Sequence, residues 1–350
     1  MGSPKWLLIS TLNPETPTVV AVGDAAKRCV PLSSILRPAD RCLAAAAVRT
    51  VCRTGVAVAS DSGGKVVAVD PISDDDSGLV HAVWLRIGYT GSAVPFRPSA
   101  WAFVWDLDSA VAKRSAMVSS FESWASLGVD RSRSVADGLS RLDLGSNTAS
   151  VLARLVSGAA KSVLQVQGVE RRPRGENRII QVVAQFYPPA NSSGIKGLVR
   201  GVSVDLGSAQ GDRLPGQCRQ RSLDELVARA MSKPNEYRAV VDPNTLALLS
   251  WYGDAPESLA WRRLRKDGER PKPVLHPDDV PLARSIAQTL RQSVEGHQEA
   301  VTLRFLNRNS AYVPVAVAAR MIALDLDVQA ILCVLTLQHE SNAEIVARCV

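Results

Sequence analysis

The order of predicted structural elements repeats three times along the 350-residue chain. Each third opens with an aromatic-led apolar strand and a second short strand. A helical stretch follows, and three strands rich in Val, Ile and Leu close the unit. Residue identities do not repeat, only the layout. Such a repeat predicts successive small domains, and two or three domains of about 100–150 residues fit this chain length.

The C-terminal third shows the layout most clearly. The capping box Ser222-Leu-Asp-Glu225 predicts a helix start, because the hydroxyl and the carboxylate each satisfy a free backbone N–H. Pro234 ends that helix. Strands are then predicted at residues 237–241 and 246–251, with a turn at Asp242-Pro-Asn244 between them.

A second helix is predicted to begin at His276-Pro-Asp-Asp279 and to stop at Gly296. One of its aspartates can cap the helix, and Pro281 fits the first turn. Apolar residues follow at helical spacing. The three closing strands are predicted at residues 300–306, 312–324 and 328–337.

The other two thirds follow the same plan. In the middle third the predicted strands are 101–106, 110–115, 163–169, 179–186 and 195–206, with a helix near 148–156. In the first third they are 6–12, 18–23, 55–59, 65–70 and 80–87, with a helix over 40–53. Short Gly- and Pro-bearing linkers at 89–98 and 207–216 separate the units. We therefore predict domains at 1–93, 94–209 and 210–350, the last with an N-terminal helix and a short C-terminal tail.

The C-terminal third resembles a PAS domain over roughly residues 237–338. Residues 241–251 are similar to the opening PAS hairpin, and His276-Pro-Asp-Asp279 resembles the HPDD helix start of that family. Val301-Thr-Leu-Arg-Phe305 and Tyr312-Val-Pro-Val315 resemble the next two strands. The resemblance implies an α+β fold with an antiparallel sheet of about five strands and flanking helices.

The first two thirds resemble PAS or GAF domains by the order of their elements, and the sequence leaves open which of the two each third is. The whole arrangement resembles an actinobacterial family of proteins with three successive sensor domains and no output domain. The expected fold class is therefore α+β, with three successive PAS/GAF-like domains.

Four residues are candidates to line a ligand pocket: Trp105, Trp251, Trp261 and Arg304. The tryptophans lie in or beside segments that would wall a PAS pocket. Large aromatic side chains more often fill the core of a small domain, so core packing is the favoured interpretation of the tryptophans. For His276, Asp278 and Asp279 the favoured role is a structural helix start instead of metal or haem ligation.

No motif for catalysis or cofactor binding is present in the sequence. It contains no Gly-rich phosphate loop, no GxSxG elbow and no HExxH pair. No cysteine lies in the Asn-Cys-Arg context of photosensory flavin domains. The acidic run Asp74-Asp-Asp76 is interpreted as a solvated loop. We expect no catalytic residue, no metal site and no cofactor.

Charge and cysteine content narrow the class of protein further. The formal net charge of +7 is modest, and basic and acidic residues alternate, so nucleic-acid binding is not expected. The six cysteines show no CxxC pair, which is typical of a reduced cytoplasmic protein. No window holds about 18 uninterrupted apolar residues, so no transmembrane segment is predicted.

These observations favour a non-catalytic cytoplasmic signalling protein. It would sense a small ligand or a protein partner and transmit the change through protein–protein interaction, and a homodimer is possible. The helix at 222–232 and the tail at 342–350 are candidate docking elements. The alternative is a ligand-free scaffold, in which PAS-fold domains serve only as binding surfaces.

Overall fold

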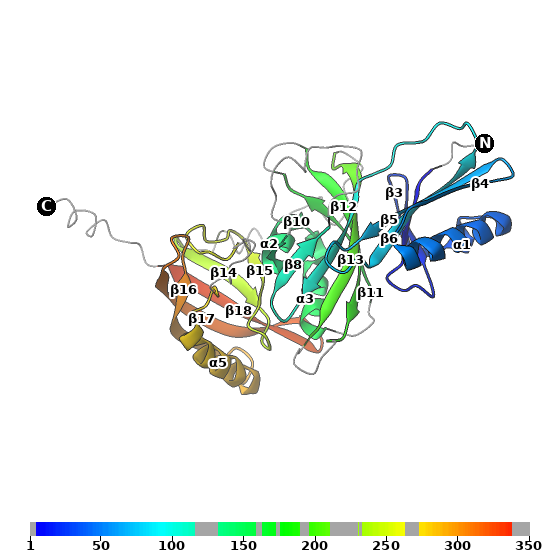
Figure 1. The fold of residues 1–350 in the computed structure, drawn as a ribbon. Helices are drawn as coiled ribbons and strands as arrows, with labels where there is room; N and C mark the ends of the chain where they lie inside the picture. The colour runs from blue at the N-terminus through cyan, green and yellow to red at the C-terminus, as the bar shows by residue number, and fades with distance from the viewer. Residues whose placement is uncertain are drawn as a thin grey trace. The chain divides into compact units, whose positions relative to one another are not determined.

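The computed structural model describes residues 5–115, 132–158, 163–172, 176–189, 196–210, 230, 233–262 and 273–337. The candidate docking elements at 222–232 and 342–350 lie outside these residues, except for residue 230, which is helical. In the described residues the fold is α+β and mostly strand. It contains three antiparallel sheets, of six, seven and five strands (Figure 1).

The N-terminal sheet has the strand order β3-β2-β1-β6-β5-β4. Its strands are β1 (Leu7–Ser10), β2 (Thr18–Val22), β3 (Ala25–Pro31), β4 (Val58–Ser62), β5 (Lys65–Ser73) and β6 (Val80–Tyr89). A short 3-10 turn (Leu32–Ser34) leads to helix α1 (Pro38–Thr54), which ends at Gly55 in the left-handed conformation. Ala44, Val48 and Val51 of α1 pack on one face of the sheet.

The middle sheet has the order β10-β11-β12-β13-β7-β8-β9. Its strands are β7 (Ala100–Asp106), β8 (Val111–Arg114), β9 (Ser132–Ser134), β10 (Leu142–Asp143), β11 (Val163–Glu170), β12 (Arg178–Tyr187) and β13 (Leu198–Ser208). The long central pair β12 and β13 is almost entirely buried, as expected of strands covered on both faces.

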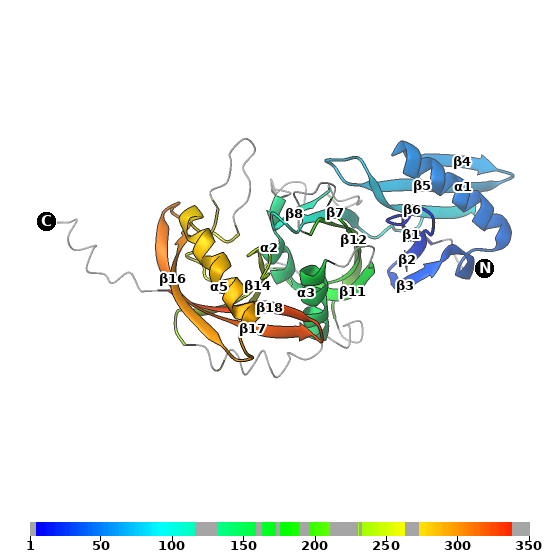
Figure 2. The ribbon, with the colours of Figure 1, turned by 90° about the horizontal axis from the view of Figure 1, so that it is seen from below.

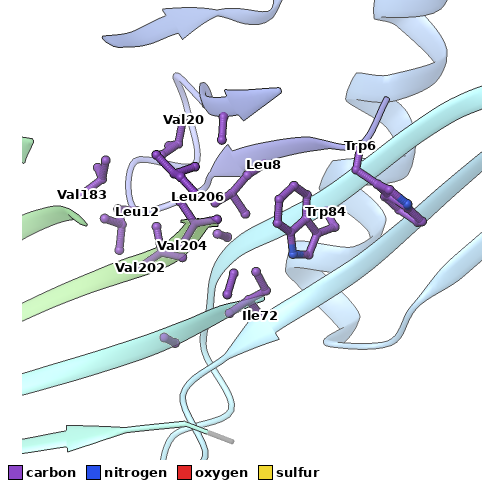
Figure 3. Close-up of a cluster of buried hydrophobic side chains, with 14 of the residues drawn as sticks. Trp6, Leu8, Leu12, Val20, Ile72, Trp84, Val183, Val202, Val204 and Leu206 are labelled. Atoms are coloured by element: carbon purple, nitrogen blue, oxygen red, sulfur yellow. The ribbon is translucent and has the colours of Figure 1, made fainter. Parts of the chain in front are cut away.

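The N-terminal and middle sheets share one hydrophobic core. The second face of the N-terminal sheet contributes Leu8, Ile72 and Trp84, and the middle sheet contributes Val183 and Val202 (Figure 3). Trp84 is fully buried. The N-terminal sheet is therefore a central layer, with α1 on one side and the middle sheet on the other.

The C-terminal sheet has the order β15-β14-β18-β17-β16. Its strands are β14 (Glu236–Val241), β15 (Leu248–Tyr252), β16 (Gln298–Leu306), β17 (Tyr312–Asp325) and β18 (Val328–Leu337). A 3-10 turn (Pro277–Asp279) leads into helix α5 (Val280–Gln292), which lies across this sheet in Figure 2. Ala287 and Leu290 of α5 pack against Ala319 and Ile331.

Two helices from the middle of the chain join the C-terminal sheet in one compact unit. These are α2 (Val135–Ser140) and most of α3 (Thr148–Ser157). The other compact unit holds the N-terminal and middle sheets. The chain therefore leaves the first unit within β9, after Ser132, forms α2 in the second unit, and returns to the first at Arg141, just before β10.

The number of strands differs from the expected five in two of the three sheets. The C-terminal sheet has five, but the N-terminal sheet gains β3 and the middle sheet gains β9 and β10. The strands β9 and β10 have only three and two residues, too short for an alternating pattern to show. Each sheet lies within one of the ranges 1–93, 94–209 and 210–350, and those boundaries remain a prediction.

Candidate functional site

Two of the tryptophans proposed from sequence lie together in the C-terminal unit. Trp251 on β15 and Trp261 form an edge-to-face pair with ring centroids 5.6 Å apart. Trp261 is buried, and its indole N–H donates to the carbonyl of Pro256 at 3.0 Å. The buried Nε1 of Trp251 has no hydrogen-bond partner within the described ranges.

The tryptophan pair belongs to a cluster that joins the sheet to α2. Its strand residues come from β14, β16, β17 and β18, and Ala136 is the contribution of α2. The buried residues of the cluster are Ala136, Ala239, Leu259, Trp261, Leu303, Val315, Val317 and Leu335. This cluster, here called the tryptophan cluster, is the candidate site of the C-terminal unit.

Ion pairs of Asp137 connect α2 to β9 and to Arg262, the residue that follows Trp261. The Asp137 carboxylate lies 3.1 Å from Nη1 of Arg133, and the two side chains are only 5% and 11% exposed. Nε of Arg262 lies 3.7 Å from the same carboxylate, and the Arg262 guanidinium stacks 4.7 Å from the Trp261 ring centroid. Asp137 thus links α2 to the residue next to Trp261.

The link between α2 and Trp261 is not predicted from the sequence. Ser134-Val-Ala-Asp137 has the spacing of a capping box, and the Ser134 hydroxyl indeed accepts from the Asp137 N–H at 3.1 Å. That pattern could have located the start of α2. Nothing in it indicates which sheet the helix contacts, because a six-residue helix carries too short an apolar face.

Arg304, the fourth pocket candidate, is held by the start of the helical segment before α5. Its guanidinium donates to both carboxylate oxygens of Asp279, at 2.6 Å from Nη2 and 3.1 Å from Nε. The backbone N–H of Arg304 donates to the same carboxylate at 2.7 Å. Asp278 lies farther from this guanidinium, at 3.6 Å. Arg304 therefore fastens the helix start to β16.

His276 takes part in the same attachment. Its Nδ1 accepts from the Asp278 N–H at 3.2 Å, which caps the 3-10 turn, and its backbone N–H donates to the carbonyl of Arg304 at 2.9 Å. The imidazole packs edge-on against Tyr312, with ring centroids 4.5 Å apart. His276 and the two aspartates lie where the sequence places the helix start.

The contacts of Asp279 predict an acid-sensitive element. Hydrogen bonds from the side chain and backbone of Arg304 lower the pKa of Asp279 to about 2. Because this pKa lies below the unfolded value of about 4, the carboxylate stabilises the fold above pH 4. That contribution is lost as the pH falls from about 4 through about 2. In Asp279→Asn we expect a flatter dependence of stability on pH in this window, measured by circular dichroism during acid titration. An unchanged dependence would contradict the prediction.

Trp105 lies apart from the other candidates in sequence and in sheet. It is on β7 of the middle sheet and packs on Phe103, with ring centroids 5.1 Å apart. The structure thus brings Trp251 and Trp261 together, places Arg304 on Asp279, and puts Trp105 in the other compact unit.

Buried and half-buried titratable groups elsewhere have pKa values shifted toward their neutral forms. Burial raises the pKa of the Cys333 thiol to about 12 and also raises the pKa of Cys29 and Cys52. Burial lowers the pKa of His81, whose Nδ1 lies 2.9 Å from the carbonyl oxygen of Gly201. Within the described ranges, no three His, Cys, Asp or Glu side chains come together as a metal site would require.

Over the described part of the chain, no helix is both long and apolar enough to cross a membrane.

Comparison with known proteins gives matches at both ends of the chain. Residues 5–96 match the family model described as Rv3651-like, N-terminal, and residues 221–348 match that of the Rv3651-like, C-terminal domain. No curated protein matches the chain.

Two solved structures illustrate the range of structural similarity. The chain is similar to an uncharacterised protein from Mycobacterium tuberculosis, with 25% identity and a TM-score of 0.76 over 97% of this chain and 98% of that one. A match to an RNA-binding light-oxygen-voltage receptor has 13% identity and a TM-score of only 0.22, over 71% and 97% of the two chains. The second similarity is too weak to support an argument. The chain carries both the N-terminal and the C-terminal domains of the Rv3651-like family, an actinobacterial-type family.

Proposed function

We propose that this protein is a non-catalytic cytoplasmic signalling protein whose three sheets are domains of the PAS/GAF type. In this proposal the tryptophan cluster responds to a small ligand or a protein partner, and the response reaches another protein by direct contact. The observation that carries the proposal is the position of α2, which supplies Ala136 and Asp137 to the C-terminal unit.

The connections of α2 provide a route for transmission. Helix α2 directly follows β9 and directly precedes β10, both of which are strands of the middle sheet. Leu142 and Asp143 of β10 pair with Glu170 and Val169 of β11. A shift of Trp261 would displace Ala136 and Arg262, and therefore α2. Because the helix is short, its displacement would pull on strands at both of its ends.

The indole N–H of Trp251 supports a ligand at the tryptophan cluster. It is a buried donor without a partner in the described residues, and a buried donor left unpaired costs roughly 1–3 kcal/mol. A ligand with a carbonyl or hydroxyl oxygen would satisfy it. Cys333 is a partly buried residue of β18 that packs against the tryptophan cluster. Its thiol, with a pKa of about 12, stays protonated, which supports a binding role over nucleophilic catalysis.

The alternative function is a ligand-free scaffold. Trp261 is 4% exposed and packs edge-on against Trp251, an arrangement that fills the centre of the cluster with the protein's own side chains. A domain filled in this way would act through its surface alone.

One experiment separates the two functions. The native protein is purified, its absorption spectrum is recorded, and extracts are analysed by mass spectrometry, alongside Trp251→Phe and the control Trp105→Phe. A stoichiometric small molecule that is lost from Trp251→Phe but kept by Trp105→Phe supports the sensor. A molecule kept equally by both variants places the ligand elsewhere, and the lack of any bound molecule favours the scaffold.

The transmission step has its own measurement. Hydrogen exchange over residues 135–140 is expected to slow when the extracted molecule is added back to the ligand-free protein. Unchanged exchange in α2 with ligand bound would contradict transmission through this helix while leaving ligand binding intact.

A further inference from the structure

Arg86 is a buried cation on the inner face of the N-terminal sheet. It is only 8% exposed, and its Nε and Nη1 atoms have no hydrogen-bond partner among the residues that the structure describes. Arg86 follows Ala82 and Trp84 at alternate positions of β6, the strand face that packs toward the middle sheet. Burial removes these two donor atoms from water, and no acceptor in the described residues replaces the water.

The guanidinium groups of Arg86 and Arg97 both lie near the ring of Trp6. The guanidinium carbon of Arg86 lies 5.7 Å from the centroid of the Trp6 ring, and that of Arg97 lies 5.1 Å from the same ring. The Trp6 indole N–H donates to the Pro95 carbonyl at 3.1 Å, which fixes the ring in place. Trp6 and Trp84 both belong to the shared core shown in Figure 3.

The two arginines near Trp6 carry two positive charges, and only one of them is ion-paired in the described residues. Arg97 is ion-paired with Asp70, which lies opposite Trp84 on the neighbouring strand β5. Arg86 has no ion pair within the described residues. Arg86, Arg97 and Asp70 therefore leave one surplus positive charge at this end of the core.

The interaction with Trp6 leaves the Nε and Nη1 donors of Arg86 without a hydrogen-bond acceptor in the described residues. A ring face attracts the cation as a whole, but it does not replace the hydrogen bonds that its N–H groups make in water. A second unpaired donor lies two residues away on the same strand face, the fully buried Nε1 of Trp84. This end of the core thus presents donors and positive charge without a matching acceptor.

We propose that Arg86 is the centre of a binding site for an oxyanion, the carboxylate or phosphate group of a small ligand. The anion would accept from Arg86 and neutralise the surplus charge, while the Trp6 ring packs against the guanidinium. Charge-assisted hydrogen bonds to an oxyanion are stronger than those between neutral groups, so a buried guanidinium is well suited to this role. The site lies in the N-terminal domain, so it does not depend on the function proposed for the tryptophan cluster.

The test measures whether oxyanions stabilise the full chain through Arg86. Thermal unfolding is recorded in sodium phosphate, sodium acetate and sodium chloride at equal ionic strength and neutral pH. For the unaltered chain we expect phosphate or acetate to raise the unfolding midpoint at least about 2 °C above chloride. The more effective of the two anions identifies a phosphate or a carboxylate ligand.

Two variants show whether the effect belongs to this site. Arg86→Met removes the buried charge with a side chain of similar length, and we expect it to abolish the difference between the salts. Arg49→Met removes an exposed arginine of α1 and should leave that difference unchanged. Equal midpoints in all three salts for the unaltered chain, or an anion effect that persists in Arg86→Met, would overturn the proposal.

A measurement on the unaltered chain covers the case in which Arg86→Met does not fold. In protein labelled with ¹⁵N-tryptophan, phosphate or acetate should shift the indole resonances of Trp6 and Trp84. The resonances of Trp251 and Trp261, which lie in the other compact unit, serve as the internal control. The absence of any shift at Trp6 and Trp84 rules out the site.

Discussion

Replacing Trp84 by alanine is expected to lower the free energy of unfolding of the first compact unit by about 3–5 kcal/mol. Trp84 is fully buried where the N-terminal and middle sheets share one core (Figure 3). It contacts a cluster drawn from both sheets, so the cavity left by alanine cannot close by the movement of one side chain. The expected loss is a large part of the stability of an ordinary domain.

Hydrogen exchange read by mass spectrometry measures this loss separately in each unit, because the chain is not expected to unfold in one step. Peptides from β6 should exchange much faster in Trp84→Ala, and peptides from β14 should not. Phe96→Ala is the matched control, since Phe96 is an aromatic residue that is 66% exposed. A change in β6 no larger than in this control would show that the two sheets do not depend on Trp84.

Asp137→Ala is expected to destabilise the second compact unit by about 3–5 kcal/mol, because it removes the carboxylate of an ion pair whose two side chains are only 5% and 11% exposed. Asp137 also lies within 3.7 Å of Arg262, which stacks on Trp261. We expect faster exchange in α2 and in β15 and little change in β6. The exposed Asp327→Ala, in the turn between β17 and β18, controls for the loss of a surface carboxylate.

A double variant distinguishes the ion pair from simple packing. In Arg133→Met with Asp137→Leu both charges are replaced by apolar groups, so no buried charge is left unpaired between these two positions. Such replacements are often neutral or stabilising, and we expect the double variant to be more stable than Asp137→Ala alone. If the double variant is equally unstable, the carboxylate is required for another reason.

Long elements with a strong pattern could be predicted from the sequence. The helix predicted over 40–53 is α1, which spans Pro38–Thr54. The strand predicted at 55–59 begins only at Val58, because Gly55 adopts the left-handed conformation that ends α1. Strands β16, β17 and β18 lie within one or two residues of their predicted ranges. Polar turns separate these strands, so the apolar pattern and the turn residues indicate the same strand limits.

The contacts between distant segments could not be predicted. Strand β3 reads Ala25-Ala-Lys-Arg-Cys-Val-Pro31, which has neither clean alternation nor an apolar run, and only its pairing with β2 makes it a strand. The approach of Ala136 to Trp261 spans about a third of the chain, and no local pattern records it. For the same reason the sequence did not identify Arg86, since an arginine within an apolar strand shows its lack of an acceptor only when its neighbours are known.

The placement of α2 has a consequence for how such a protein can be divided and recombined. Although the C-terminal sheet forms from a continuous stretch of sequence, a fragment that begins at residue 210 lacks the helix that covers part of its own core, and Trp261 loses Ala136 as a neighbour. In a chimeric protein, the C-terminal sheet of one relative should therefore be transferred together with the α2 of the same relative. We expect substitutions near Ala136 and near Trp261 to be correlated among relatives, because both residues pack in the same cluster.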